Sequence, residues 1–250
     1  MRSSPWPWLN ALALALTITA NGLANALPIN GQTTGEVSDR FEVYFVPAGY
    51  VFSIWGLIYL ALLAFVIDGL LRRESPLHER VGGWFALSCL ANAAWLVLWH
   101  YERFAGTVAL MLTLLVSLCA IYLRPDPGRA GASRRDRALV LFPFSLYLGW
   151  VSVATIANVT SYLDFIAWSG WGLEPARWMQ VMLGVTATLC AIMTARTRDV
   201  VYLLVIIWAL VGIALKHAAV PAVASASWLT AGVVGLLALI SLALRWRARA

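Results

Sequence analysis

Residues 46–71 form a long apolar stretch in which Asp68 is the one charged side chain. About 20 helical residues, each rising 1.5 Å, span the roughly 30 Å hydrocarbon core of a bilayer. Only 12% of all residues are charged and 61% are hydrophobic, whereas a soluble domain carries about 25% charged residues. The sequence therefore predicts an all-α integral membrane protein that contacts the lipid bilayer.

Seven further apolar runs have the length of a membrane span or nearly so. They cover residues 8–27, 83–100, 104–123, 138–162, 178–195, 200–215 and 228–244. We therefore expect eight transmembrane helices. The runs 83–100 and 104–123 are expected to form a tight antiparallel hairpin because so few residues separate them. Residues 124–137 are rich in Pro, Gly and Arg, which is typical of a solvated loop.

The distribution of basic residues predicts the topology. If the amino terminus is cytoplasmic, the other side of the membrane keeps only four of the 18 basic residues, namely Arg40, Arg103, Arg177 and Lys216. This asymmetry satisfies the positive-inside rule and favours two cytoplasmic termini, most simply in a bacterial inner membrane. The net charge of +6 lies in short segments between spans, so it does not indicate nucleic-acid binding.

The first apolar run has two interpretations. Arg2, a moderately apolar region and the Ala-Asn-Ala sequence at residues 24–26 resemble a cleavable signal peptide. Alternatively, Asn21 and Asn25 lie four residues apart on one helical face, where a retained helix would use them. The second interpretation is favoured, and the first stays open.

Polar side chains inside the apolar runs need partners, because an unpaired polar group in hydrocarbon costs free energy. Asn92 and Trp95 lie in the middle of the third run, and Trp150, Thr155 and Asn158 lie in the fifth. One interpretation is hydrogen bonding between helices, worth about 0.6 kcal/mol per bond. The other is a ligand pocket under the polar segment 29–45. The sequence leaves both interpretations open.

Catalytic and metal-binding patterns are absent from the sequence. The three cysteines have no CxxC or Cys/His spacing. We find no Ser/His/Asp set, phosphate loop or HExxH motif, and no paired carboxylates in the middle of a span. We therefore expect no catalytic residue, no metal site and no required cofactor. An enzyme is the alternative, and the sequence offers it no general base.

Three ordered motifs resemble the TspO/MBR family, the tryptophan-rich sensory or translocator proteins. Residues 47–59 read PAGYVFSIWGLIY, similar to that family's first loop and second helix. Asn92 with Trp95 is similar to its Asn-Trp-x-Trp motif, although Ala93 replaces the first Trp. The fifth run carries Pro143, Trp150, Ala154, Thr155 and Asn158, similar to the fifth helix of the family. Ala48 and Tyr50 depart from the usual Pro and Trp at the pocket mouth.

The resemblance covers roughly residues 8–163 and implies a division of the chain. A five-helix bundle is expected over residues 1–163, followed by a three-helix membrane extension over 164–250. The family binds tetrapyrroles such as haem or porphyrin, or other small apolar ligands, and acts in sensing or regulation, often as a homodimer. A membrane transporter is the alternative, which eight spans would accommodate, but no internal repeat supports it.

The resemblance and the polar positions together predict the ligand-binding residues. They are Asn21, Asn25, Pro47, Tyr50, Phe52, Trp55, Asn92, Trp95, Trp150, Thr155 and Asn158. Indole faces suit stacking on a flat apolar macrocycle, and carboxamides donate hydrogen bonds to its edge.

Overall fold

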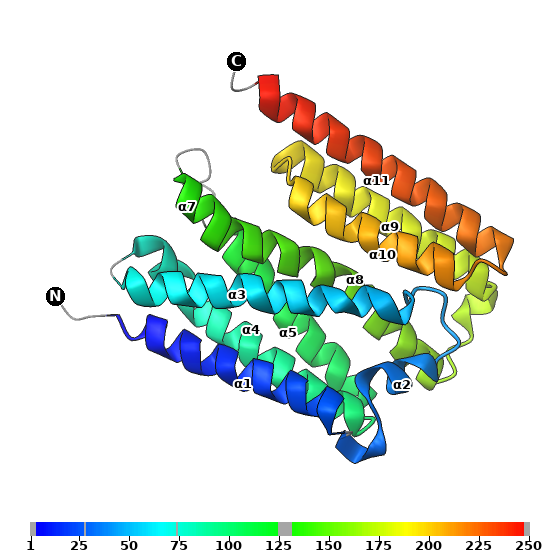
Figure 1. Cartoon of the computed structure of the whole chain (residues 1–250). Coiled ribbons are helices and arrows are strands. Elements are labelled where there is room, and N and C mark those ends of the chain that lie inside the picture. Colours follow the sequence, from blue (N-terminus) through cyan, green and yellow to red (C-terminus); the bar gives the residue numbers. More distant parts are fainter. Residues whose placement is uncertain (1–3, 28, 74, 125–131, 248–250) are drawn as a thin grey trace. The chain divides into compact units, whose positions relative to one another are not determined.

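The computed structural model of the chain describes residues 4–27, 29–73, 75–124 and 132–247 (Figure 1). Within these ranges every regular element is a helix, which confirms the predicted all-α class. Nothing is described of the side chain of Asn25, so this predicted ligand contact lies outside the described part of the structure.

Each predicted apolar run forms a helix. These helices are α1 (Trp6–Ala26), α3 (Ile54–Leu71), α4 (Pro76–His100), α5 (Phe104–Leu123), α8 (Phe142–Phe165), α9 (Pro175–Arg196), α10 (Val200–Lys216) and α11 (Pro221–Arg247). Proline lies in the first turn of α1, α4 and α9, where its missing N–H costs no helical hydrogen bond.

Length and composition identify six membrane-spanning candidates among the described residues. They are Gly49–Leu71, Pro76–His100, Phe104–Leu123, Arg134–Phe165, Pro175–Arg196 and Pro221–Arg247. Trp6–Ala24 with Ile29–Asp39, bent by 46°, would be a seventh. Helix α10 has 17 residues and is shorter than the others. The membrane character of the fold is therefore clear, and the count of eight spans stays a prediction.

Short helical elements occupy the connections. They are η1 (Ile29–Gly31), α2 (Thr34–Asp39), η2 (Gly49–Ser53), α7 (Arg134–Asp136), η3 (Arg137–Leu141) and η4 (Gly170–Gly172). A capping box between Thr33 and Glu36 begins α2. The prediction of a loop over 124–137 is wrong at its end, because Ser133 caps a helix there by accepting from the Asp136 N–H. Residues 125–131 of that predicted loop lie outside the described residues.

The π-helical turn η3 precedes Pro143 in the sequence. A proline inside a helix removes one hydrogen bond and its ring crowds the carbonyl four residues earlier, here that of residue 139. A wider turn over Arg137–Leu141 accommodates this defect, so α7, η3 and α8 run on as one long helical segment.

The chain divides into two compact units. The N-terminal unit comprises Met1–Arg40 and Ile54–Val151, and the C-terminal unit comprises Phe41–Ser53 and Ser152–Ala250. The predicted division between residues 163 and 164 follows motif coverage rather than packing, and it stays a prediction.

Helix α4 is the centre of the N-terminal unit and packs against α1 and α5. Figure 1 shows α4 and α5 as the expected antiparallel pair, joined through residues 101–103. Helix α1 approaches α4 closely, since a Cβ at Gly82 would lie 2.6 Å from the Cβ of Trp6. Thr17 in α1 also donates to the carbonyl of Cys89 in α4 at 3.0 Å. These contacts fix α1 beside α4.

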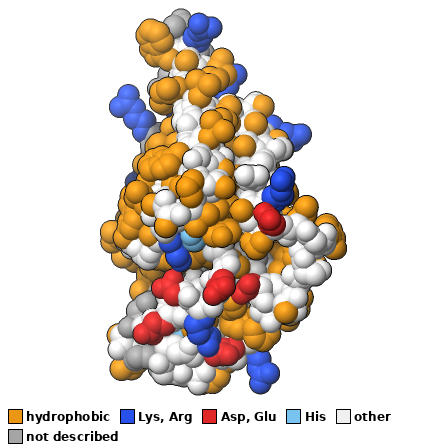
Figure 2. Space-filling model, turned by 90° about the vertical axis from the view of Figure 1, so that its right-hand side faces the viewer, with side chains coloured by type: hydrophobic (Ala, Val, Ile, Leu, Met, Phe, Trp, Pro, Cys, Tyr) orange, Lys and Arg blue, Asp and Glu red, His pale blue; other side chains and the backbone are white. Residues whose placement is uncertain are grey.

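The C-terminal unit packs α11 against both α9 and α10, and η2 against α10. Large apolar side chains remain exposed on the outer helix faces, as in Leu229 at 72% and Trp246 at 77%. Leu60 in the other unit is 68% exposed. Figure 2 shows hydrophobic side chains over much of the surface in view. Such contiguous apolar surface is expected of helices in contact with lipid tails.

Candidate functional site

Asn92 is the polar centre of a buried group in the N-terminal unit. The side chain of Asn21 in α1 donates through Nδ2 to Asn92 Oδ1 at 3.0 Å. Asn92 Nδ2 in turn donates to the hydroxyl of Tyr147 in α8 at 3.0 Å. Asn92 is 2% exposed and Tyr147 is 1% exposed. This Asn21–Asn92–Tyr147 chain connects three helices with carboxamide and phenol groups alone.

Aromatic rings from α3 and α8 adjoin this chain. Trp55 stacks on Tyr59 with ring centroids 5.4 Å apart and meets Tyr147 edge-on at 5.8 Å. It also meets Trp150 edge-on at 6.2 Å. Tyr147 therefore belongs both to the hydrogen-bonded chain and to the aromatic cluster of Trp55, Tyr59, Tyr147 and Trp150. These separations are typical of favourable aromatic pairs.

The structure thus brings together four of the predicted ligand contacts, Asn21, Trp55, Asn92 and Trp150. Trp95 lies about one turn from Asn92 in α4 and stacks on Trp99 with centroids 5.1 Å apart. Trp99 in turn meets Phe104 edge-on at 5.3 Å and donates through Nε1 to the carbonyl of Thr34 at 3.2 Å. Trp95 is therefore half-buried within a second aromatic group, at the α4–α5 turn.

Five predicted contacts belong to the C-terminal unit. Asn158 is buried at 3% exposure and Thr155 is half-buried, both in α8. Pro47, Tyr50 and Phe52 lie in segment 41–53. Tyr50 is 47% exposed and meets Trp208 of α10 edge-on at 5.4 Å. The ligand-binding role of these five residues stays a prediction.

The polar segment before residue 41 is tied to the α4–α5 turn. Arg40 Nη1 lies 3.0 Å from Glu102 Oε1, and this hydrogen bond with Arg40 holds the pKa of Glu102 below its usual value. His100 is fully buried, with Nδ1 2.8 Å from the Leu96 carbonyl and Nε2 3.3 Å from Thr34 Oγ1. His100 therefore anchors α2 to the end of α4.

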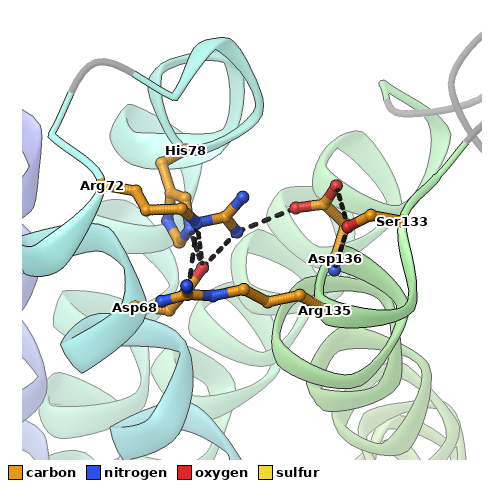
Figure 3. A network of polar contacts seen from close by, with 6 residues as sticks. All are labelled: Asp68, Arg72, His78, Ser133, Arg135 and Asp136. Carbon is orange, nitrogen blue, oxygen red and sulfur yellow. Dashed lines mark hydrogen bonds and ion pairs between the residues drawn. The ribbon is translucent and has the colours of Figure 1, made fainter.

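A charged network lies in the same unit, where α3, α4 and α7 meet (Figure 3). Asp68 is 1% exposed and accepts from Arg72, one helical turn later. It also lies 2.8 Å from His78 Nε2 and 2.6 Å from Arg135 Nε. Because an ionised carboxylate only accepts, Nε2 of His78 carries the shared proton.

Asp136 completes this charged network by pairing with Arg72 at 2.8 Å. The pKa of Arg72 is raised, chiefly by its hydrogen bond to Asp68. Two carboxylates thus face two guanidinium groups, and the charges balance with His78 neutral. Phe65 stacks on the His78 ring at 4.7 Å, so the network rests on the aromatic core of the unit.

Sequence reasoning missed three residues of these clusters, Tyr147, His78 and Arg135. In the sequence Tyr147 is one of several aromatic residues in an apolar run, and His78 and Arg135 lie in polar connections between runs. Tyr147 could have been found from its phenol hydroxyl, a polar group in an apolar run three residues before Trp150. Among the described residues no group of three or more His, Cys, Asp or Glu side chains is placed to hold a metal ion.

The chain matches the family described as TSPO-like protein over residues 7–240. The match includes α9, α10 and the greater part of α11, which extend beyond the region of motif resemblance. No curated protein matches the chain, and no solved structure matches it.

Proposed function

The chain belongs to the TSPO-like protein family, and we propose that it is a sensory or regulatory membrane protein that binds a small apolar ligand. A tetrapyrrole such as haem or porphyrin is the proposed ligand class. This class comes from the TspO/MBR resemblance, and the residue chemistry of the N-terminal unit supports it.

The observation that carries the proposal is the junction of the Asn21–Asn92–Tyr147 chain with the aromatic cluster. Trp55 and Trp150 offer indole faces, and Tyr147 joins these rings to Asn92. A macrocycle with apolar faces and carboxylate groups at its edge needs both kinds of contact. All of these groups are uncharged, so an apolar ligand would replace side-chain contacts without leaving a buried charge unpaired.

Titration with protoporphyrin IX, followed by quenching of tryptophan fluorescence in detergent, tests this function. We expect saturable quenching in the unaltered protein and about fivefold weaker binding in Asn92→Leu, since one hydrogen bond is worth about 1 kcal/mol. Leu90→Ala is the matched control, because Leu90 lies in the same helix and is 51% exposed. Trp55→Phe should also weaken binding, whereas Trp246→Phe removes an exposed indole and should not.

Two results would overturn the proposal. One is the absence of saturable quenching in the unaltered protein. The other is equal affinity in Asn92→Leu, Trp55→Phe and both controls, with circular dichroism showing that all variants remain helical.

The proposed topology has eight spans, two cytoplasmic termini and a bacterial inner-membrane location. The positive-inside asymmetry supports it, because losing one span would place the later arginines on the opposite side. Reporter fusions at both termini test it. A carboxyl-terminal reporter that is active only outside the cytoplasm would contradict it.

Transport and dimer formation are separate proposals that rest on the family resemblance. Accumulation of porphyrin in sealed vesicles containing the protein would favour a transporter over a sensor. A homodimer predicts a protein mass in detergent of twice 27.3 kDa, measured by light scattering with the detergent contribution subtracted.

A further inference from the structure

Segment 41–53 docks along helix α10 within the C-terminal unit. The backbone N–H of Ala48 donates to the Gly212 carbonyl at 3.3 Å. Trp208 Nε1 donates to the Val51 carbonyl at 3.1 Å. Val46 is 3% exposed and Val51 is fully buried. Backbone and apolar side chains of the segment are therefore both engaged by one helix.

Two edge-on aromatic contacts extend this docking. Tyr50 meets Trp208 at 5.4 Å, and Tyr44 meets the ring of His217 at 5.2 Å. His217 follows the last residue of α10. Burial and the neighbouring Lys216 lower the pKa of His217, which favours the neutral imidazole against Tyr44. The contacts thus run from the middle of α10 to its end.

Gly212 is the point of closest approach between the segment and α10. A Cβ at this position would lie 2.1 Å from Val51 Cγ2 and 3.3 Å from the Cβ of Pro47. The first distance is shorter than real carbon atoms allow, so any other residue at 212 would displace Val51. The absence of a side chain at 212 lets the segment lie directly on the helix backbone.

We propose that α10 holds segment 41–53 in position, with Gly212 and Trp208 as the positioning residues. This segment carries Pro47, Tyr50 and Phe52, and the consequence for ligand binding rests on the proposed function. By holding these three predicted ligand contacts, α10 has a role in ligand retention.

Hydrogen exchange of segment 41–53 in the full-length protein tests the positioning role. Gly212→Ala should raise exchange of the Ala48 and Val51 amides by about tenfold or more, because the docked state opens more often. Alanine favours a helix more than glycine does, so α10 itself should stay protected. Gly184→Ala in α9 is the matched control, since a Cβ there would meet no atom within 4 Å.

A compensating change makes the test specific. Val51→Ala removes the Cγ2 atom that clashes. The remaining neighbours of the new Cβ, Pro47 Cβ at 3.3 Å and Val51 Cβ at 3.4 Å, require only a small shift. The double variant Gly212→Ala with Val51→Ala should therefore return exchange toward the unaltered rate. Unchanged exchange in Gly212→Ala, or an equal rise in Gly184→Ala, would overturn the positioning role.

Porphyrin dissociation, measured in the same variants, separates this inference from the proposed function. We expect dissociation to be several-fold faster in Gly212→Ala and to slow again in the double variant. Faster exchange with an unchanged dissociation rate would overturn the role in ligand retention. Absence of porphyrin binding in the unaltered protein would overturn that role and the proposed function together, while exchange would still decide whether α10 positions the segment.

Discussion

The N-terminal unit contains two buried polar clusters of opposite character. The charged network around Asp68 joins α3, α4 and α7 through ion pairs. The Asn21–Asn92–Tyr147 chain joins α1, α4 and α8 through neutral hydrogen bonds. Asp68 and Asn92 are equally hidden, at 1% and 2% exposure. Asp68 is charged and is surrounded by basic side chains, whereas Asn92 is neutral and contacts Asn21 and Tyr147.

This difference separates a structural cluster from a candidate ligand site. A buried carboxylate is tolerated because Arg72, His78 and Arg135 all contact it. Removing the carboxylate leaves the two arginines without their shared counter-charge. Asn92 instead borders the aromatic cluster of Trp55, Tyr59, Tyr147 and Trp150. If Asn92 exchanged a side-chain partner for a ligand, the protein would lose only one neutral hydrogen bond. We therefore expect the charged network to govern stability and the neutral chain to govern binding.

The largest expected effect is that of Asp68→Asn. Removing the shared carboxylate leaves two guanidinium groups short of their main counter-charge, and breaking a buried ion pair costs about 3–5 kcal/mol. Thermal or denaturant unfolding in detergent measures the loss. Glu79→Gln, an exposed carboxylate in the first turn of α4, is the control. A loss below about 1 kcal/mol for Asp68→Asn would remove the structural role from this network.

Tyr147→Phe should have the next largest effect on stability. The change removes the acceptor for Asn92 Nδ2 and leaves a buried donor unpaired, which costs about 1–3 kcal/mol. The ring, and hence its contact with Trp55, remains. Tyr101→Phe, at a residue that is 55% exposed, should stay within about 0.5 kcal/mol. If Tyr147→Phe weakens porphyrin binding no more than Tyr101→Phe does, the neutral chain does not orient the ligand.

Arg135→Gln should lower stability by about 1 kcal/mol, less than Asp68→Asn does. The Arg135 side chain is 49% exposed, and Asp68 keeps its contacts with Arg72 and His78. Urea unfolding of both variants under the same conditions gives the comparison. Equal losses for Arg135→Gln and Asp68→Asn would mean that the carboxylate is not shared among several partners.

The smallest effect is expected at the exposed pair Arg40–Glu102. Its side chains are 45% and 40% exposed, and such pairs contribute about 0–1 kcal/mol. Arg40 lowers the pKa of Glu102 from the ordinary 4.5, so the pair stabilises the fold above this pH. Its contribution is lost as the pH falls below about 4.5 and Glu102 takes up a proton. Arg40→Gln should reduce this pH dependence, and added salt should weaken it. A salt-independent effect above about 2 kcal/mol would contradict this view.

Local pattern predicted much of what the structure shows. The long apolar runs correspond to α1, α3, α4, α5, α8, α9, α10 and α11, because the cost of exposing backbone to hydrocarbon enforces helices of bilayer length. The α4–α5 hairpin also followed from spacing, since so few residues separate the two apolar runs.

Partners distant in the chain were decided only by the tertiary structure. Asn92 hydrogen-bonds to Tyr147, Asp68 contacts Arg135, and Val51 lies against Gly212. Hydropathy says which residues enter the membrane but not which helices become neighbours, because lipid tails and apolar side chains are equivalent surroundings. Side-chain shape and hydrogen-bond geometry make that choice, and they depend on pairs of helices rather than on any single run of sequence.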